Sequence, residues 1–292
     1  MRGRRRIANR ASVSSALADW LREGAARLST VSDTPRLDAE LIAAHALGLS
    51  RADMLLRLRD LAVPDGVEAL LARRLAHEPV AQLIGTRDFW TLTLKVTPEV
   101  LIPRPDSETL IEAAIDHFRD RPPPRRILDL GTGSGALLLA ALDVWPEASG
   151  VGVDISPAAL AVARENAVAC GMAARAEFRL GDWCMGLNEE GFDLVLSNPP
   201  YIKKSASLEA QVLREPEMAL FGGFDGLEAY RVLARQLPGF GDSLLLAVVE
   251  IGWDQRETAA ALFAEAGFTV GIRSDLAGHP RCLVLTSPGN SG

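Results

Sequence analysis

The sequence predicts an α/β protein whose main domain is a doubly wound, mostly parallel sheet, preceded by a small helical domain. From about residue 126 onward, short apolar and β-branched runs alternate with segments of helical periodicity, which is typical of a parallel sheet covered by helices. Before residue 85 the apolar residues recur at helical spacing. A glycine-rich turn between the first expected strand of the sheet and its helix favours the same fold class.

The composition is that of an ordinary globular protein of about two domains. Of its 292 residues 48% are hydrophobic, and the formal net charge is −7. Such a chain lacks the basic field of a protein that holds nucleic acid through its phosphates, so we expect no DNA partner. No apolar run is long enough to span a membrane. We expect no membrane association and a monomeric protein.

Two features bear on where the protein resides. Its three cysteines are scattered and lack a CxxC spacing, which disfavours a disulfide framework or a zinc site and favours a reducing compartment. Residues 1–10 hold five arginines and no acid, and serines follow at 12, 14 and 15. This composition is typical of a transit peptide. We favour a disordered basic tail or a start codon placed too far upstream, because arginine is the usual base throughout the chain.

Residues 11–84 are expected to form a bundle of helices. Three segments carry apolar residues at helical spacing, and glycine or proline turns separate them. The residues at this spacing are Leu17, Trp20, Leu21, Ala25 and Leu28, then Leu37, Leu41, Ala44 and Leu47, then Val67, Leu70, Leu71 and Leu75. Docking of a partner protein and a role as a folding appendage both suit this segment.

Residues 85–100 are expected to form a β-hairpin that links the two domains, because residues 89–96 show a two-residue periodicity. Two prolines order the next segment, which leads into a helix. Asp106 or Ser107 is expected to cap that helix. Arg104 lies between the prolines. It either lines the mouth of the site that the main domain carries or is a surface charge.

Seven strands and their connecting helices are expected in residues 101–292. The strands are expected at residues 127–130, 151–154, 177–180, 192–197, 244–251, 268–272 and 282–285. Helices are expected at residues 136–142, 157–169, 225–237 and 254–266. Ser156 is placed to cap the second of these helices.

A cofactor site is expected where the first three strands end. The turn after the first strand is Gly131, Thr132, Gly133, Ser134 and Gly135. Its glycines let a ligand approach the backbone, and the helix that follows presents free N–H groups. Asp154 ends the second strand and suits the hydroxyls of a ribose, while Asp182 and Trp183 follow the third and suit an adenine. The alternatives are a packing turn for the glycines and a core position for Trp183.

The fourth strand runs into the motif Asn198, Pro199, Pro200 and Tyr201. The two prolines make this loop stiff. An amide or amino nitrogen is a poor nucleophile, and the Asn198 side-chain oxygen and the Pro199 carbonyl can accept its two N–H groups. The Tyr201 ring can stack on the same planar group. The alternative is a simple turn plugged by an aromatic residue.

With these residues assembled, the chain resembles S-adenosylmethionine-dependent methyltransferases, and most closely the HemK/PrmC family. That family methylates the side-chain amide nitrogen of the glutamine in the Gly-Gly-Gln motif of peptide-chain release factors. The resemblance starts near residue 16, and its most specific part is Ile102-Pro103-Arg104-Pro105-Asp106-Ser107-Glu108. The chain departs from the family pattern at Arg214, where an aromatic residue is expected before Glu215-Pro216.

The resemblance implies a Rossmann-like methyltransferase domain over residues 101–292, with S-adenosylmethionine as its cofactor. Release factors would be the protein substrates, docked by residues 11–84. The turn at residues 131–135 would hold the methionine part of the cofactor, Asp154 its ribose and Trp183 its adenine side. The Asn198–Tyr201 motif would hold the glutamine amide, and Asn198 would also contact the cofactor. We expect a bacterial cytoplasmic protein, with an organellar matrix as the second choice.

The implied reaction is an in-line transfer of a methyl group from a sulfonium to the amide nitrogen. Positioning and electrostatics suffice for such a reaction, and we expect no metal. The sequence offers no convincing general base. Three alternatives stay open: an adenine-N6 DNA or RNA methyltransferase, a non-catalytic translation-factor-binding protein, and a dinucleotide oxidoreductase. The acidic charge and the lack of a basic, aromatic-interleaved domain disfavour the first of them.

Overall fold

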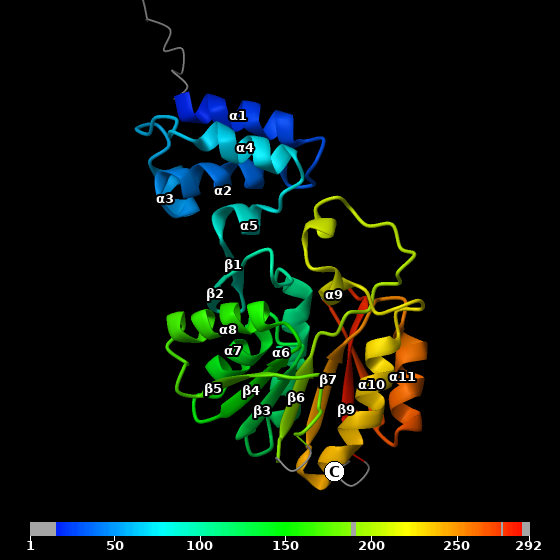
Figure 1. Cartoon of the computed structure of the whole chain (residues 1–292). Coiled ribbons are helices and arrows are strands. Elements are labelled where there is room, and N and C mark those ends of the chain that lie inside the picture. The colour runs from blue at the N-terminus through cyan, green and yellow to red at the C-terminus, as the bar shows by residue number, and fades with distance from the viewer. Residues whose placement is uncertain (1–15, 188–190, 276, 288–292) are drawn as a thin grey trace, which may run out of the picture. The chain divides into compact units, whose positions relative to one another are not determined.

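The computed structural model describes residues 16–187, 191–275 and 277–287 (Figure 1). It divides into two compact units, Met1–Ile84 and Gly85–Gly292. The predicted basic tail at residues 1–10 lies outside the described residues. Across the described ranges, no helix has the length and apolar character that crossing a membrane requires.

The described part of the first unit is helical, as the periodicity predicts, and it has five helices where three periodic segments were identified. They are α1 (Ala16–Leu28), α2 (Pro35–Leu47), α3 (Arg51–Leu56), α4 (Val67–Leu75) and α5 (Val80–Ile84). Helix α2 is central and packs against the other four. A C-cap at Gly48, in the left-handed conformation, ends α2.

The buried face of α2 differs from the predicted one. Leu37, which the apolar spacing directs inward, is 39% exposed. The residues that α2 buries most completely are Ala39, Ile42 and Ala43. Because four helices surround α2, it has no single apolar stripe, and small alanines let its neighbours approach closely. A periodicity argument that assumes one buried face therefore places Leu37 wrongly and misses Ala39, Ile42 and Ala43, although it identifies Ala44 correctly.

A buried ion pair crosses the helical unit. Arg74 of α4 donates from Nε to Oδ2 of Asp38 in α2 at 2.8 Å, and both side chains are almost fully buried. Glu40, also buried, receives hydrogen bonds from Arg36 and Arg51. Charges this deep are tolerated only when they are paired, so these contacts set how α2 packs against its neighbours.

The second unit begins with the predicted hairpin. Strands β1 (Thr86–Phe89) and β2 (Leu92–Lys95) pair antiparallel and form a separate two-stranded sheet. Phe89 and Leu94 are buried in the core that the hairpin shares with the helices of the main sheet. The hairpin is therefore packed into the second unit.

The main sheet has the predicted seven strands. They are β3 (Arg126–Leu130), β4 (Ser149–Asp154), β5 (Ala176–Leu180), β6 (Leu194–Ser197), β7 (Leu246–Glu250), β8 (Thr269–Ser274) and β9 (Pro280–Thr286). Their order is β5-β4-β3-β6-β7-β9-β8, and β9 alone runs opposite to the other six strands. The mostly parallel, doubly wound sheet is confirmed.

Helices cover both faces of this sheet (Figure 1). They are α6 (Glu108–Phe118), α7 (Ala136–Val144) and α8 (Pro157–Ala169) on one face, and α10 (Glu228–Gln236) and α11 (Arg256–Glu265) on the other. A short helix, α9 (Glu217–Leu220), lies in the connection after β6. Alternate residues of each strand enter opposite cores; Leu194 and Leu196 of β6 face one, and Val195 faces the other. The predicted N-cap of α8 is confirmed, since Ser156 Oγ accepts from the Ala159 N–H at 3.2 Å.

The buried pair of the helical unit leads to a stability prediction. Replacing Arg74 with Met leaves the Asp38 carboxylate buried without its main partner. We expect a loss of about 3 kcal/mol in the free energy of unfolding, the usual cost of breaking a buried pair from one side. Urea unfolding of the full-length protein, followed by circular dichroism, measures this loss.

Arg22→Met is the matched control, because its ion pair with Asp19 is exposed. It should change the free energy of unfolding by less than about 1 kcal/mol. Equal stabilities of the two variants would contradict the structural role of the buried pair.

Candidate active site

One cavity of the second unit brings most of the predicted site residues together. It lies where β3, β4, β5 and β6 end, as expected at the carboxyl edge of a parallel sheet. The predicted residues that line it are Gly131, Thr132, Gly133, Ser134, Asp154, Asp182, Trp183, Asn198 and Pro200. Four predicted residues do not line it: Arg104, Gly135, Pro199 and Tyr201.

The glycine turn is held in place by Asp154. The Gly133 N–H donates to Asp154 Oδ2 at 2.9 Å, and the Ser156 N–H donates to Oδ1 at 2.9 Å. Gly133 has a φ of 54°, in the region that favours glycine. Asp154 thus shapes the turn in addition to lining the cavity, a role that sequence reasoning missed. Gly135 instead serves packing, because a Cβ there would lie 3.3 Å from the Cβ of Ala163.

A second carboxyl, Asp129, lies beneath the turn and was not predicted. It is 1% exposed, and burial raises its pKa to about 7. Its Oδ2 accepts from Thr132 Oγ1 at 2.6 Å and from the Leu138 N–H at 3.3 Å. The sequence did contain a signal for Asp129. It is an acidic residue within an apolar strand, two positions before the glycine turn. Asp129 braces the turn and the first turn of α7.

Trp183 lies both at the cavity and against the core, while its predicted contact with an adenine stays a prediction. Its indole lines the cavity, and it also packs against the buried core on one face of the sheet. Its φ is 54°, which is costly for a residue with a large side chain. A Cβ built on Gly131 would lie 3.8 Å from the Trp183 ring. The glycine therefore keeps the space beside the indole open.

The Asn-Pro-Pro-Tyr loop presents free acceptors. The Asn198 Nδ2 group donates to Ser107 Oγ at 3.0 Å. Within the ranges that the structure describes, neither the Asn198 side-chain oxygen nor the Pro199 carbonyl accepts a hydrogen bond. Asn198 lines the cavity, so its oxygen is available to a ligand there. Pro199 does not line the cavity, so the predicted two-acceptor arrangement stays a prediction.

Tyr201 takes a different place from the predicted one. It does not line the cavity, and its hydroxyl donates to Glu250 Oε1 at 3.2 Å. Burial raises the pKa of this hydroxyl above its ordinary value. The backbone of Gly222 packs closely against this loop. A Cβ atom at Gly222 would lie only 2.4 Å from the Pro200 carbonyl oxygen, so the contact requires glycine.

The predicted helix caps at Asp106 and Ser107 are wrong. Neither side chain makes a cap hydrogen bond to α6. Ser107 Oγ donates to Glu250 Oε2 at 2.5 Å, and Asp106 pairs with Arg281 at 2.9 Å. Both side chains turn to partners at the ends of β7 and β9, which are distant in sequence. Ser107 itself lines the cavity.

Arg104 forms an ion pair with Glu215. Glu215 is buried, which raises its pKa, and it also accepts from the Ile102 N–H at 2.8 Å. This clamp joins two segments whose other residues line the cavity: Leu101 and Pro103 on one side, Pro216, Met218 and Ala219 on the other. Arg104 thus fixes the rim of the cavity. Its predicted contact with a substrate stays a prediction.

Comparisons with known proteins agree with this geometry. The chain matches the family described as PrmC N-terminal domain over residues 19–85, and the methyltransferase small domain over residues 107–220. A release factor glutamine methyltransferase of Rhodospirillum rubrum is 43% identical, covering 92% of this chain and 84% of its own length. Proteins of the same name from Cereibacter sphaeroides and Bordetella pertussis are 43% and 44% identical, over 93% and 85% of this chain and 98% and 93% of their own lengths.

Among solved structures, the hMettl16 catalytic domain is similar in fold. Its TM-score is 0.55 at 14% identity, covering 75% of this chain and 81% of that one. At this identity the likeness supports the methyltransferase fold of the second unit and carries no further conclusion.

The cavity fits the S-adenosylmethionine expected from the sequence. The open space that Gly131 leaves beside the Trp183 indole suits a flat ring. Asp154 and Asp182 supply carboxylates, and the glycine turn supplies backbone groups at the start of α7. Leu137, Val153 and Ile155 give the lining an apolar part. These donors and acceptors match the amino, ribose and adenine groups of this molecule.

The ribose role of Asp154 can be tested by calorimetry. Asp154→Ala removes a charged acceptor and the anchor of Gly133, so we expect S-adenosylmethionine to bind about tenfold to a hundredfold more weakly, the range for a hydrogen bond to a charged group. Asp143→Ala, at an exposed position of α7 outside the cavity, is the control and should bind normally. An unaltered affinity of the Asp154 variant would refute the role.

Proposed function

The chain belongs to the release factor glutamine methyltransferase family, whose cofactor is S-adenosylmethionine, and we propose that it methylates the Gly-Gly-Gln glutamine of peptide-chain release factors. The methyl group goes to the side-chain amide nitrogen, N5. The observation that carries this proposal is a pair of acceptors to which no hydrogen bond is donated in the described part of the chain: the side-chain oxygen of Asn198, which lines the cavity, and the carbonyl of the adjacent Pro199. They match the two N–H groups of a primary amide.

The free acceptors determine how the substrate nitrogen is presented. The lone pair of an amide nitrogen is delocalised, so the nitrogen reacts only when it is held close to an electrophile in a fixed orientation. One N–H donates to the Asn198 side-chain oxygen and the other to the Pro199 carbonyl. Pro199 is buried and Pro200 has a fixed φ, so neither acceptor has to be reorganised during the reaction.

The residues around the cofactor site supply position rather than covalent chemistry. Bound S-adenosylmethionine supplies an activated methyl group on a sulfonium. The glycine turn, Asp154, Trp183 and Asn198 all line the cavity in which the cofactor would bind. The new N–C bond would form as the bond between the methyl group and the sulfonium sulfur breaks, with that electron pair staying on sulfur. The positively charged nitrogen would then lose one proton to water. Asn198 is neutral, so it does not compete for the methyl group as a carboxylate would.

The helical unit is proposed to dock the release factor. Its support is the match of residues 19–85 to the PrmC N-terminal domain and the absence of any predicted catalytic residue from this unit. The bacterial origin of the similar proteins favours the cytoplasm of a bacterium as the site of action. A monomer that acts on one release factor at a time is sufficient for this function.

The function is tested by incubating the purified protein with S-adenosylmethionine and a full-length release factor. DNA and a release factor whose motif glutamine is changed to alanine serve as parallel substrates. We expect peptide mass spectrometry to place one methyl group on the motif glutamine alone. Methylated adenine in the DNA would favour the adenine-N6 alternative instead. Cofactor binding without any transfer would favour a binding role.

Asn198→Ala separates catalysis from cofactor binding. Loss of one preorganised group at the reacting centre typically costs about 10² to 10³ in kcat. We therefore expect turnover on the release factor to fall by about this factor, while the affinity for S-adenosylmethionine measured by calorimetry stays near that of the unaltered protein. A variant that turns over at the normal rate would remove Asn198 from the mechanism.

A further inference from the structure

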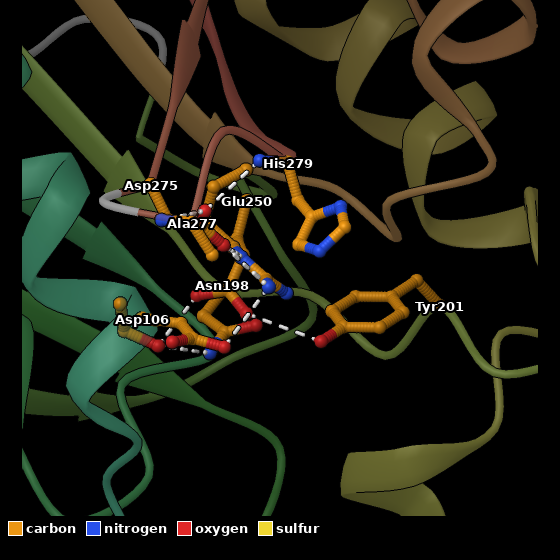
Figure 2. A network of polar contacts seen from close by, with 9 residues as sticks. Asp106, Asn198, Tyr201, Glu250, Asp275, Ala277 and His279 are labelled. Atoms are coloured by element: carbon orange, nitrogen blue, oxygen red, sulfur yellow. Dashed lines mark hydrogen bonds and ion pairs between the residues drawn. The ribbon is translucent and has the colours of Figure 1, made fainter.

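The carboxylate of Glu250 lies behind the Asn198 loop. Glu250 is the last residue of β7, is 1% exposed and does not line the cavity. Figure 2 shows it in one polar network with Asp106, Asn198 and Tyr201. The mechanism described above does not use this group. A carboxylate so deeply buried requires hydrogen-bond donors, and their identity determines what it does.

Both oxygens of Glu250 receive donors that touch the active loop. Ser107 Oγ donates to Oε2 at 2.5 Å, and the Tyr201 hydroxyl donates to Oε1 at 3.2 Å. Ser107 Oγ in turn accepts from Asn198 Nδ2 at 3.0 Å. The result is a hydrogen-bond chain that runs from Asn198 through Ser107 to Glu250, built from three segments far apart in the sequence.

The ionised carboxylate gives this chain a direction. A carboxylate can only accept hydrogen bonds, so the single Ser107 hydroxyl proton must go to Glu250. Toward Asn198, Ser107 then has only lone pairs to offer. Asn198 must therefore turn its NH₂ group to Ser107 and leave its carbonyl oxygen free in the cavity lining. A side-chain amide has nearly the same shape when its oxygen and its NH₂ group exchange places. Here the charge of Glu250 determines which of the two faces Ser107.

We propose that Glu250 is a positioning residue that keeps the Asn198 carbonyl oxygen available to the substrate amide. The inference rests on the proposed function, since it specifies how the acceptor for the glutamine N–H is oriented. When Glu250 is protonated, it can donate to Ser107, and Ser107 can donate to the Asn198 oxygen. Asn198 can then present its own NH₂ group to the NH₂ group of the substrate, which places donor against donor.

The surroundings of Glu250 let both protonation states occur near neutral pH. Burial raises the pKa of Glu250 to about 7, while hydrogen bonds from Ser107 and Tyr201 and the charge of Arg281 act in the opposite direction. Asp106 adds to the increase. Tyr230 and Cys282 are further titratable groups that Glu250 influences, and Asp275 pairs with the same Arg281. Because the acid has a raised pKa, Glu250 is ionised above about pH 7 and protonated below it.

The hydrogen-bond chain from Asn198 to Glu250 predicts that the methylation rate depends on pH through Glu250. In single turnovers with saturating S-adenosylmethionine and a release factor, the rate should rise with pH through about 7. Glu250→Gln can either donate or accept, so it should lose this inflection. Its rate at pH 8 should fall roughly tenfold, as expected for one misdirected hydrogen bond. Asp129, whose pKa is also raised to about 7, is intact in this variant and cannot account for the difference.

Matched variants separate the effect of hydrogen-bond direction on the rate from an effect on folding. Glu265→Gln makes the same change at an exposed position of α11 and should keep the inflection of the unaltered protein. Ser107→Ala breaks the chain and should reduce the rate at pH 8 at least as much as Glu250→Gln. Ser107→Thr keeps the hydroxyl group and should retain most of the rate that Ser107→Ala loses at pH 8. Glu250→Gln and Glu265→Gln should bind S-adenosylmethionine in calorimetry with near-normal affinity, because neither changed group lines the cavity.

An independent measurement follows the Asn198 amide itself. Its side-chain ¹H–¹⁵N resonances, assigned by their loss in Asn198→Ala, should shift between pH 6 and 8 in the unaltered protein with a midpoint of about 7. They should not shift in this way in Glu250→Gln.

The outcomes are distinguishable. An inflection and an amide titration that persist in Glu250→Gln would overturn the inference and leave the proposed function intact. A protein that methylates no release factor at any pH would overturn the proposed function and, with it, the inference.

Discussion

A buried carboxylate at the end of β7 is the constraint on which the site depends. Removing the charge of Glu250 from water is costly, so the fold must supply it with donors. These come from Ser107, before α6, and from Tyr201, after β6. Satisfying one charge therefore ties three segments together at the edge of the sheet. The same contacts hold the loop whose acceptors, on Asn198 and Pro199, suit a primary amide.

The sheet makes this arrangement possible. Four parallel strands end at one edge, and cores on both faces fix how far each strand reaches. The glycine turn, Asp154 and Trp183 line the same cavity as Asn198 there, although they come from separate parts of the sequence. A second clamp, in which Glu215 joins the backbone of Ile102 and the side chain of Arg104, closes the rim. Buried polar groups thus brace the cavity at the loop and at the rim.

Much of the fold and of the cofactor site was predictable because the responsible signals are local. Each strand is a short apolar run, and each helix follows it with its own periodicity. The glycine turn directly follows β3 and Asp154 is the last residue of β4, so placing the strands also places these residues in one crevice. Helix α2 shows the limit of this reasoning. It is surrounded by four helices, and its apolar spacing no longer identifies a buried face.

The sequence by itself determined the α/β sheet, the helical unit, the glycine turn with Asp154 and the Asn-Pro-Pro-Tyr loop, because each depends on residues that are adjacent in the chain. Only the tertiary structure decided what Ser107, Tyr201 and Glu250 do. Ser107 and Glu250 are 143 positions apart, and no periodicity or motif links them. Their hydrogen bond exists because burial leaves the carboxylate without solvent and with only nearby protein groups, the hydroxyls of Ser107 and Tyr201 among them, to donate to it. This condition arises only after the strands and α6 have packed.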